Sequence, residues 1–220
     1  MRLRLYLTIA FVLSVVCLIG FSLLALQISG NSLLHFDRQM ISFIQGFETP
    51  WLTSLMKFFS FIGSVPVVIL LCLLCMYILY KLLHHYSELL LFISVAIGSA
   101  VLNLMLKLIF HRARPDLHQL VEISGYSFPS GHAMNAFTVY GIFAFLMWRH
   151  LYTKWGRIWL IIASTWMILL IGLSRIYLGV HYPTDIIGGY LASGVWVTAA
   201  ILFFQYYKEK RYNKNYKLGG

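Results

Sequence analysis

The stretch "LLLFISVAIGSAVLNLMLKLIFHRARP", residues 89–115, joins a long apolar run to a cluster of basic residues. A helix that spans a bilayer needs about 20 predominantly apolar residues, and this run is long enough. Lys107 lies inside the run, where a charge costs free energy and usually serves a function. Arg112 and Arg114 follow the run, just before Pro115. We therefore expect a membrane-spanning helix that carries functional cations at one end.

Apolar runs of this kind recur along the chain, which is 60% hydrophobic and only 11% charged. A soluble domain is nearer to half apolar and a quarter charged, so the composition predicts an integral membrane protein. The expected spans cover about residues 5–28, 64–83, 88–109, 132–148, 157–175 and 186–206. No linker separates a second domain. We predict an all-α fold, an integral membrane six-transmembrane-helix bundle in one domain over residues 1–220.

The segment between the first two expected spans is too irregular to cross the bilayer. Residues 36–64 are apolar at helical spacing but are interrupted at Gly46 and Pro50, which predicts two short helices along the outer interface. The first span, Leu5 to Ile28, is longer than the roughly 7–15 apolar residues of a signal peptide, and no A-x-A site follows it. It is therefore expected to remain in the protein as a helix.

The formal net charge of +10 is distributed unevenly. A cytoplasmic N-terminus places 11 of the 17 Lys and Arg residues on the cytoplasmic side, and the positive-inside rule favours this orientation. Both termini, including the basic tail at residues 207–220, are then expected on the cytoplasmic side of the cell membrane. The tail is expected to contact anionic lipid, and nucleic acid is not an expected partner.

Three cysteines, Cys17, Cys72 and Cys75, lie within the apolar spans. The C-x-x-C formed by Cys72 and Cys75 is typical of redox or zinc sites in soluble proteins, but no histidine partner stands nearby here. We interpret the side chains of Cys72 and Cys75 as packing residues, and no disulfide is implied.

The first polar group, "KLIFHRARP" at 107–115, lies where the third expected span reaches the outer face. Lys107 and Arg114 are seven residues apart, which on a continuous helix places both on one stripe about 10 Å apart. Pro115 is expected to end that helix. The alternative is that the cations only anchor the helix end by extending to the interface, which would explain Arg112 well and Lys107 less well.

The second polar group, "PSGH" at 129–132, precedes the fourth expected span. Ser130 is a favourable helix cap, and the first turn of a helix leaves backbone N–H groups free to bind an anion. Gly131 lets an oxyanion approach the backbone, and His132 can donate a proton near neutral pH. Taken alone, the phrase is equally compatible with an ordinary helix cap and an interfacial histidine.

The third polar group, "SRIYLGVHYPTD" at 174–185, joins the fifth and sixth expected spans. Pro183 suits the first turn of the last span. His181 and Asp185 are four residues apart, so the carboxylate can hold one imidazole N–H and leave the other nitrogen free to attack. A capped helix start, with Asp185 favoured by the helix dipole, is the alternative, and it accounts poorly for Arg175 and His181 together.

All three groups face the outer side of the membrane, so we expect them to form one site. It would contain three cations, a helix N-terminus and an imidazole supported by a carboxylate, an arrangement suited to phosphoryl transfer. No metal or other cofactor is required, because the cations can hold the equatorial oxygens of the phosphoryl group. The sequence contains no P-loop, no zinc-type spacing of Cys and His, and no catalytic cysteine.

The patterns K-x6-R-P, P-S-G-H and S-R-x5-H-x3-D, in this order, resemble the type 2 phosphatidic acid phosphatase (PAP2) superfamily. Here they read Lys107 to Arg114-Pro115, Pro129-Ser130-Gly131-His132, and Ser174-Arg175 to His181 and Asp185. All three match without a departure, and together they cover residues 107–185. The resemblance implies a metal-independent membrane phosphatase whose lipid phosphate substrate enters sideways between helices.

The resemblance also implies a role for each matched residue. His181 would be the nucleophile that forms a phosphohistidine, Asp185 would orient and polarise it, and His132 would protonate the leaving oxygen. The residues implied in binding the phosphoryl group are Lys107, Arg114, Ser130, Gly131 and Arg175. No role is assigned to His111, Arg112, Asp116 and His118, although they are near enough to shape a headgroup pocket.

The expected substrate is phosphatidylglycerophosphate or undecaprenyl pyrophosphate, with phosphatidic acid or another lipid phosphate as a broader alternative. A second hypothesis is a lipid-phosphate binding or transport protein, which the complete His–Asp–His set argues against because a binder needs no nucleophile. A third is a metal-dependent hydrolase using His132, His181, Asp185 and Asp116. Their spacing is not a standard ligand set, and the neighbouring cations would repel a metal.

Overall fold

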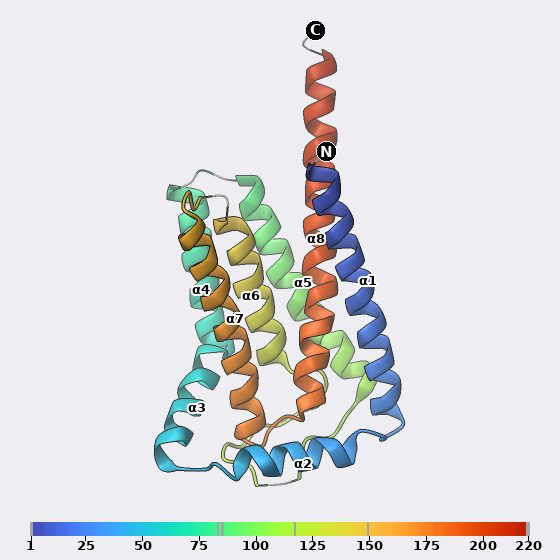
Figure 1. Cartoon of the computed structure of the whole chain (residues 1–220), viewed down its shortest axis with the longest axis vertical. Coiled ribbons are helices and arrows are strands. Elements are labelled where there is room, and N and C mark those ends of the chain that lie inside the picture. Colours follow the sequence, from blue (N-terminus) through green and yellow to red (C-terminus); the bar gives the residue numbers. More distant parts are fainter. Residues whose placement is uncertain (1, 83, 85, 117, 149, 219–220) are drawn as a thin grey trace.

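Figure 1 shows the chain as a computed structural model. The structure describes residues 2–82, 84, 86–116, 118–148 and 150–218, with the side chains of residues 2–6, 82 and 211–218 outside the description. Six of the basic residues that the predicted orientation places on the cytoplasmic side therefore lie outside the described side chains: Arg2, Arg4, Arg149, Arg211, Lys214 and Lys217.

The described ranges contain helices, turns and loops but no strand, which confirms the all-α fold class. The α-helices are α1 (Arg2–Ser29), α2 (Leu34–Gln45), α3 (Pro50–Ile62), α4 (Val65–Tyr77), α5 (Tyr86–Phe110), α6 (Gly131–Met147), α7 (Lys154–Tyr177) and α8 (Pro183–Leu218), and a short π-helix, η1 (Ile78–Leu82), continues α4. The helices α2 and α3 are the two short helices predicted between the first two spans.

Hydroxyl side chains cap the starts of three helices. Thr49, Ser130 and Thr153 each accept a hydrogen bond from the backbone N–H three residues later, at 3.2, 3.4 and 3.1 Å respectively. These bonds satisfy N–H groups that have no partner within the first turn. Pro50 and Pro183 occupy the first turn of α3 and α8, where the missing N–H costs little.

Within the described residues, α1, α5, α7 and α8 are long and apolar enough to cross a membrane by themselves. A fifth span results if α3 and the α4–η1 helix, which meet at a bend of 52°, are counted as one. Helix α6 is also apolar but has 17 residues. These findings support a multi-pass membrane protein, and the count of six spans stays a prediction.

The helices form an elongated bundle with α6 in contact with α4, α5, α7 and α8 (Figure 1). Helix α1 packs along α8, and α3 packs against α7. Helix α2 lies across one end of the bundle, where it contacts α7 and α8, and both chain termini lie at the opposite end. The end covered by α2 also carries the described loop residues 111–116 and 118–130 and the α7–α8 connection.

Small residues allow the helices to approach closely, as expected where lipid provides no hydrophobic drive for helix association. Gly98 on α5 leaves room for the indole of Trp196 on α8, whose Nε1 donates to the carbonyl of Val95 at 3.0 Å. Gly194 on α8 faces α1, and a Cβ added there would lie 3.0 Å from Sγ of Cys17. Close packing of this kind contributes to holding α5 and α1 against α8.

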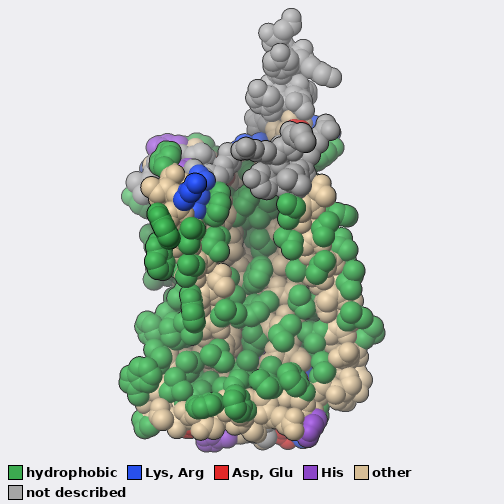
Figure 2. Space-filling model, viewed as in Figure 1, with side chains coloured by type: hydrophobic (Ala, Val, Ile, Leu, Met, Phe, Trp, Pro, Cys, Tyr) green, Lys and Arg blue, Asp and Glu red, His purple; other side chains and the backbone are tan. Residues whose placement is uncertain are grey.

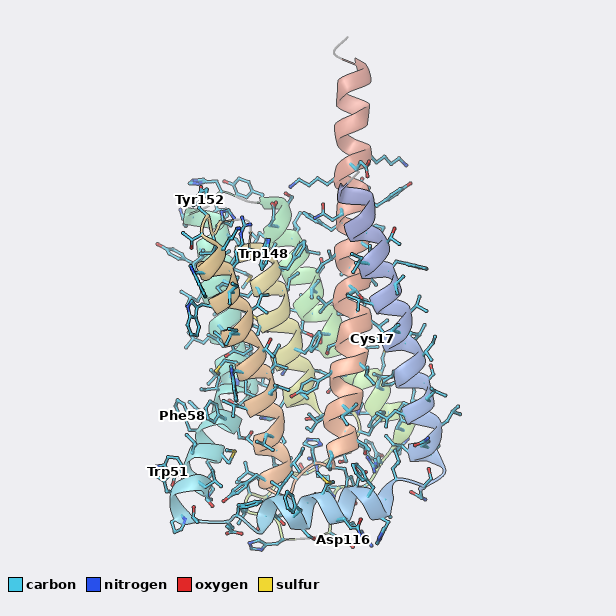
Figure 3. All side chains as sticks on the ribbon, viewed as in Figure 1. Cys17, Trp51, Phe58, Asp116, Trp148 and Tyr152 are labelled. Carbon is cyan, nitrogen blue, oxygen red and sulfur yellow. The ribbon has the colours of Figure 1, made fainter. Side chains whose placement is uncertain are left out.

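The sides of the molecule are apolar, which is the surface a bilayer requires. Figure 2 shows hydrophobic side chains along the whole bundle. Trp51 is 73% exposed near the end that α2 covers, and Tyr152 is 95% exposed at the opposite end (Figure 3). Both fit aromatic residues at membrane interfaces. Cys72 and Cys75 pack in the apolar core around α4, α5 and α6, in agreement with their interpretation as packing residues.

Helix α5 covers the expected span 88–109 but ends earlier than the predicted stop at Pro115. It ends at Phe110, and His111 has a φ of 46°, a left-handed conformation that takes the chain out of the helix. The prediction that Lys107 and Arg114 share one helical stripe is therefore wrong, as is the expectation that Pro115 ends the helix. Arg114 instead reaches the site from the loop that follows α5.

Candidate active site

The three polar groups of the sequence meet at the end of the bundle that α2 covers. The backbone N–H of Ser130 donates to the carbonyl oxygen of Asp185 at 3.1 Å, which joins the start of α6 to the start of α8. Nη1 of Arg114 lies 3.2 Å from Nε2 of His181, which joins the loop after α5 to the α7–α8 connection. The structure thus brings residues of all three groups into one cluster.

His181 lies in the α7–α8 connection and is almost completely buried. Its Nδ1 is 3.3 Å from Oδ2 of Asp185, and its Nε2 faces Arg114. Because a guanidinium only donates hydrogen bonds, Nε2 must accept, and the ring proton therefore lies on Nδ1 toward the carboxylate. Burial lowers the pKa of His181 to about 4, Asp185 opposes this shift, and Arg114 and Arg175 reinforce it. The imidazole is thus neutral near pH 7.

Asp185, the third residue of α8, is fully buried and held through both carboxylate oxygens. Oδ2 faces His181 and accepts hydrogen bonds from the backbone N–H of Tyr182, at 2.9 Å, and from the hydroxyl of Ser127. Oδ1 accepts from Nη1 of Arg112 at 2.6 Å. With both oxygens bonded, the carboxylate has a fixed orientation, and it holds the imidazole ring in turn.

The guanidinium of Arg114 is oriented by three backbone carbonyl groups. Nε donates to Gly125 at 3.0 Å, Nη2 to Ser124 at 3.2 Å, and Nη1 to Val180 at 2.8 Å. These bonds fix the plane of the guanidinium while one edge faces His181. A lysine has one nitrogen and could not make the same set of contacts.

Arg175, near the end of α7, is a buried cation with an incomplete set of partners. Its side chain donates to the hydroxyl of Ser60 on α3, and its Nε is buried without a hydrogen-bond partner. No salt bridge to Arg175 occurs among the described residues. A buried charge with an unused donor is unfavourable unless an anion binds beside it. The arrangement is therefore suited to an anionic ligand.

The start of α6 is close to α5, as its glycine permits. Ser130 is the N-cap and is fully buried. Asn103 on α5 donates to the carbonyl of Pro129 at 3.2 Å, and a Cβ added at Gly131 would lie 3.2 Å from Oδ1 of Asn103. The unpaired N–H groups of the first turn can then face an anion at close range.

His132 and Lys107 lie beside the same cluster. His132 is partly buried, and a Cβ added at Gly63, between α3 and α4, would lie 3.2 Å from its Cδ2. Nζ of Lys107 donates to the carbonyl of Tyr126 at 3.1 Å. The charged or titratable groups near enough to influence His132 are Arg175, His181, Lys107 and Arg114. All eight predicted site residues therefore lie in one region.

Arg112 is not the interfacial anchor that the alternative interpretation described. Its side chain is 12% exposed and forms ion pairs with Asp37 at 2.7 Å and Asp185 at 2.6 Å. Its guanidinium lies over the ring of Tyr182, 4.2 Å from the ring centroid. The anchoring alternative is therefore wrong for Arg112, because two buried carboxylates hold its charge away from the interface.

Sequence reasoning missed three residues that hold the site together, Asp37, Ser127 and Asn103. Asp37 is the only acid of α2, and an isolated acid in an apolar segment is a usable signal. Asn103 precedes Lys107 by one helical turn, so their spacing already placed it on the functional face of α5. Ser127 had no comparable signal, because its contact with Asp185 depends on the fold of the loop.

The other unassigned polar residues lie toward the periphery. Asp116 pairs with Arg38 at 3.2 Å, and both side chains are exposed (Figure 3 labels Asp116). His118 lies 3.4 Å from a carboxylate oxygen of Glu48, also near the surface. His111 is exposed, and its ring packs against that of a neighbouring tyrosine in the loop. Among the described contacts, none of these side chains joins His181.

Comparison with known proteins identifies the family of the chain. The family model described as PAP2 superfamily matches residues 88–209. The chain is 33% identical over 176 residues to phosphatidylglycerophosphatase B of Bacillus subtilis, a match covering 77% of this chain and 84% of that protein. It is 28% identical over 179 residues to an undecaprenyl-diphosphatase of Sulfolobus acidocaldarius, covering 78% of this chain and 79% of that protein.

A solved structure has the same fold. The crystal structure of a transmembrane PAP2-type phosphatidylglycerolphosphate phosphatase from Bacillus subtilis matches with a TM-score of 0.78 and 30% sequence identity, covering 90% of this chain and 96% of that one. The matched family segment contains all three polar groups and more than half of the chain. The chain therefore belongs to the PAP2 superfamily, and it is a membrane phosphatase that acts on lipid phosphate esters.

Proposed function

We propose that the protein removes a phosphate group from a membrane lipid through a phosphohistidine formed on His181. The main support for this proposal is the state of His181. It is buried and neutral, its Nδ1 faces Asp185, and its Nε2 lone pair faces the fixed guanidinium of Arg114. An unprotonated nitrogen beside cations is what a nucleophile for a phosphate group needs.

The reaction has two steps, and in each a phosphoryl group and a proton are transferred. In the first, Nε2 of His181 forms a bond to phosphorus, the bond from phosphorus to the lipid oxygen breaks, and His132 gives that oxygen a proton. In the second, His132 takes a proton from water as the water oxygen bonds to phosphorus, and the bond to Nε2 breaks. Phosphate leaves and both histidines return to their starting state.

The remaining predicted site residues hold the phosphoryl oxygens. Arg175 supplies a buried cation with a free Nε, and Ser130 and Gly131 supply the N-terminus of α6. Lys107 and Arg114 add further positive charge. Because these groups are oriented before the substrate arrives, they stabilise the charge of the transition state without reorganising. No metal ion is needed for this mechanism.

The proposed substrate is phosphatidylglycerophosphate. The similarity to phosphatidylglycerophosphatase B, which extends over most of both chains, supports this choice. Undecaprenyl diphosphate is the second candidate, supported by the similarity to an undecaprenyl-diphosphatase. Both lipids present a terminal phosphate to the same set of cations.

The site is proposed to face the extracytoplasmic side, with both termini in the cytoplasm. The support is that η1, which contains Lys81, and the start of α7, which contains Lys154 and Arg157, lie at the opposite end of the bundle from α2 (Figure 1). Lys208, in the C-terminal part of α8, pairs with Glu88 at the start of α5, at that same end. A membrane-impermeant thiol reagent should label Asp116→Cys in intact cells. Labelling that requires broken cells would contradict this orientation.

The test of function is phosphate release by the purified protein in excess EDTA, with both lipids offered separately. Wild type should release phosphate, His181→Ala should not, and His118→Ala should match wild type because that histidine is exposed at the periphery. Equal rates for wild type and His181→Ala would contradict the covalent mechanism. A folded wild type that binds either lipid without releasing phosphate would favour a binding protein, and activity abolished by EDTA would favour a metal enzyme.

A further inference from the structure

Arg112 links two buried carboxylates that belong to distant parts of the chain. Nη1 donates to Oδ1 of Asp185 at 2.6 Å, and Nη2 donates to Oδ2 of Asp37 at 2.7 Å. Both carboxylate side chains have no exposed surface. We call this set, Asp37, Arg112 and Asp185, the Asp–Arg–Asp bridge. It connects α2 to the carboxylate that contacts the proposed nucleophile.

Asp37 also binds the first turn of α8 from outside that helix. Oδ1 accepts from the backbone N–H of Thr184 at 3.1 Å, and Oδ2 accepts from the Thr184 hydroxyl at 2.6 Å. Asp37 thus acts like a helix cap supplied by another helix, and its negative charge suits a helix N-terminus. The bond fixes α8 one residue before Asp185, so α2 contributes directly to the position of the carboxylate.

The charges in the bridge do not cancel. Two carboxylates and one guanidinium leave a net charge of −1, which lies on the Nδ1 side of His181. Without the charge of Asp37, Arg112 would neutralise Asp185, and His181 would face Arg114 with no net negative charge behind it. Formation of a bond at Nε2 makes the ring cationic, because Nδ1 keeps its proton. A net negative charge behind the ring stabilises that cation, and a neutral pair does not.

We propose that Asp37 and Arg112 are positioning residues of the phosphatase reaction, acting on His181 through Asp185. Neither touches the substrate. Arg112 holds the carboxylate in one orientation, and Asp37 restores the negative charge that Arg112 would otherwise remove. Helix α2 is therefore part of the catalytic apparatus as well as a cover over the end of the bundle. This inference rests on the proposed function.

A purely structural ion pair is the competing explanation, since buried charges that lose a partner usually destabilise a protein. The two explanations differ in whether the variants lose stability or lose kcat. If the pair only docks α2, the losses from Asp37→Asn and Arg112→Gln should both appear as lost stability and should leave kcat of the folded fraction unchanged. If the bridge sets the charge behind His181, the loss appears in kcat and depends on the balance of charges.

The experiment measures kcat and KM for the full-length protein in detergent, with phosphatidylglycerophosphate as substrate. Asp37→Asn should lower kcat about tenfold and leave KM within about twofold, in the range of coupling between buried charged neighbours. Arg112→Gln removes the guanidinium that holds Asp185 in one orientation and leaves two unpaired carboxylates together, so kcat should fall further although the negative charge increases. Asp37→Asn/Arg112→Gln removes one carboxylate with the arginine, so its kcat should rise above that of Arg112→Gln. Arg38→Gln, which breaks an exposed pair in the same region, is the matched control.

Size-exclusion profiles and melting temperatures establish the folded fraction for each variant. A folded Asp37→Asn with wild-type kcat would overturn the inference, as would a double variant in which the two losses simply multiply. Should Asp37→Asn fail to fold, Arg112→Lys and Arg112→Gln decide the question. A kcat higher for Arg112→Lys than for Arg112→Gln would support the proposed role of the charge balance. Equal kcat values for the two variants would overturn it. A wild type inactive on both lipids overturns the proposed function, whereas an active wild type with unaffected variants overturns the bridge alone.

Discussion

Nε2 of His181 and Nη1 of Arg114 face each other at 3.2 Å. The contact assigns the imidazole tautomer, because Arg114 has no acceptor to offer and Nε2 must supply its lone pair. It also identifies the direction from which a phosphoryl group would approach, since the lone pair that accepts from Arg114 is the one that would attack phosphorus. A bound phosphoryl group would then take over hydrogen bonds from the guanidinium.

Arg114→Lys should lose most activity although the charge is retained. The guanidinium donates to the carbonyl groups of Gly125, Ser124 and Val180, and one ammonium group cannot span all three. We expect kcat/KM to fall at least about a hundredfold, in keeping with the loss of one preorganised donor at a transition state. Arg38→Lys changes an exposed arginine near the same end and should stay close to wild type. Similar kcat/KM for the two variants would show that only the charge of Arg114 matters.

Asp185→Asn should reduce turnover through the tautomer of His181. An amide NH₂ in place of Oδ2 would donate to Nδ1, so the ring proton would move to Nε2 and occupy the attacking lone pair. A fall in kcat of about 10⁴-fold is expected from the equivalent change in other histidine-dependent enzymes. Ser127→Ala removes one hydrogen-bond donor to Asp185 without changing the tautomer of His181, so its kcat should fall far less. Single-turnover rates on folded protein separate the two, and comparable losses would argue against the tautomer explanation.

The buried His181 should make the folded protein less stable in mild acid. Its folded pKa of about 4 lies below the unfolded value of about 6.5, so between these values the unfolded chain binds a proton that the folded chain does not. Stability therefore falls as the pH drops through that window, by about 2 kcal/mol at pH 5 from this residue. The groups facing the ring are Asp185, Arg114 and Arg175.

Melting temperatures of wild type and His181→Asn at pH 7.5 and pH 5 test this prediction. The melting temperature of wild type should fall more on acidification than that of the variant, which lacks His181. The other histidines are the same in both proteins, so their effect cancels in the comparison. The carboxylates of ordinary pKa remain largely ionised over this range. Equal losses in the two proteins would mean that His181 keeps an ordinary pKa in the folded state.

The clustering of polar residues that stand in a recognisable order could be predicted from the sequence. Lys107, Ser130 and His181 stand in patterns whose spacing follows local geometry, such as a helix cap or a four-residue separation on a helix start. Asp37 could not be paired with Arg112 in this way, because the two are far apart along the chain and meet only when α2 folds across the bundle. The tertiary fold alone creates that contact.

Helix boundaries could be predicted where a local sequence signal exists, and the predictions failed where there is none. Ser130 marks the start of α6 through the predicted cap, and α3 starts at Pro50, where the sequence predicted a break. His111 ends α5 by adopting a left-handed conformation, which no residue type requires at that position. Pro115 was the stronger stop signal, and the chain had already turned before reaching it. The apolar runs predicted where helices cross the bundle, but not how the α3–α4 bend divides them.

Gly179 and Gly125 form a matched pair for testing the loops that carry His181 and Arg114. Both have positive φ, 71° and 84°, a conformation that costs an alanine about 1 kcal/mol. A Cβ at Gly125 would meet nothing within 4 Å, whereas a Cβ at Gly179 would collide with the carbonyl oxygen of His118 and lie 2.9 Å from Nε2 of Gln45. Gly125→Ala should therefore destabilise the protein only through the strained backbone conformation. Gly179→Ala should destabilise it through the same strain and also through disrupted packing beneath α2.

The unfolding free energies of the two variants in detergent measure the difference. We expect Gly125→Ala to lower the free energy of unfolding by about 1 kcal/mol. Gly179→Ala should lower it by about 1–3 kcal/mol more, the range for forcing extra atoms into packed space. Gln45 donates to the carbonyl groups of His118, at 2.7 Å, and Tyr177, at 3.1 Å, so displacing it loosens the segment that leads to His181. Gly179→Ala should accordingly lower kcat as well as stability. Equal losses of stability for the two glycine variants would mean that the α7–α8 connection yields to the added methyl group. Its tight contact with α2 would then not be needed to hold His181.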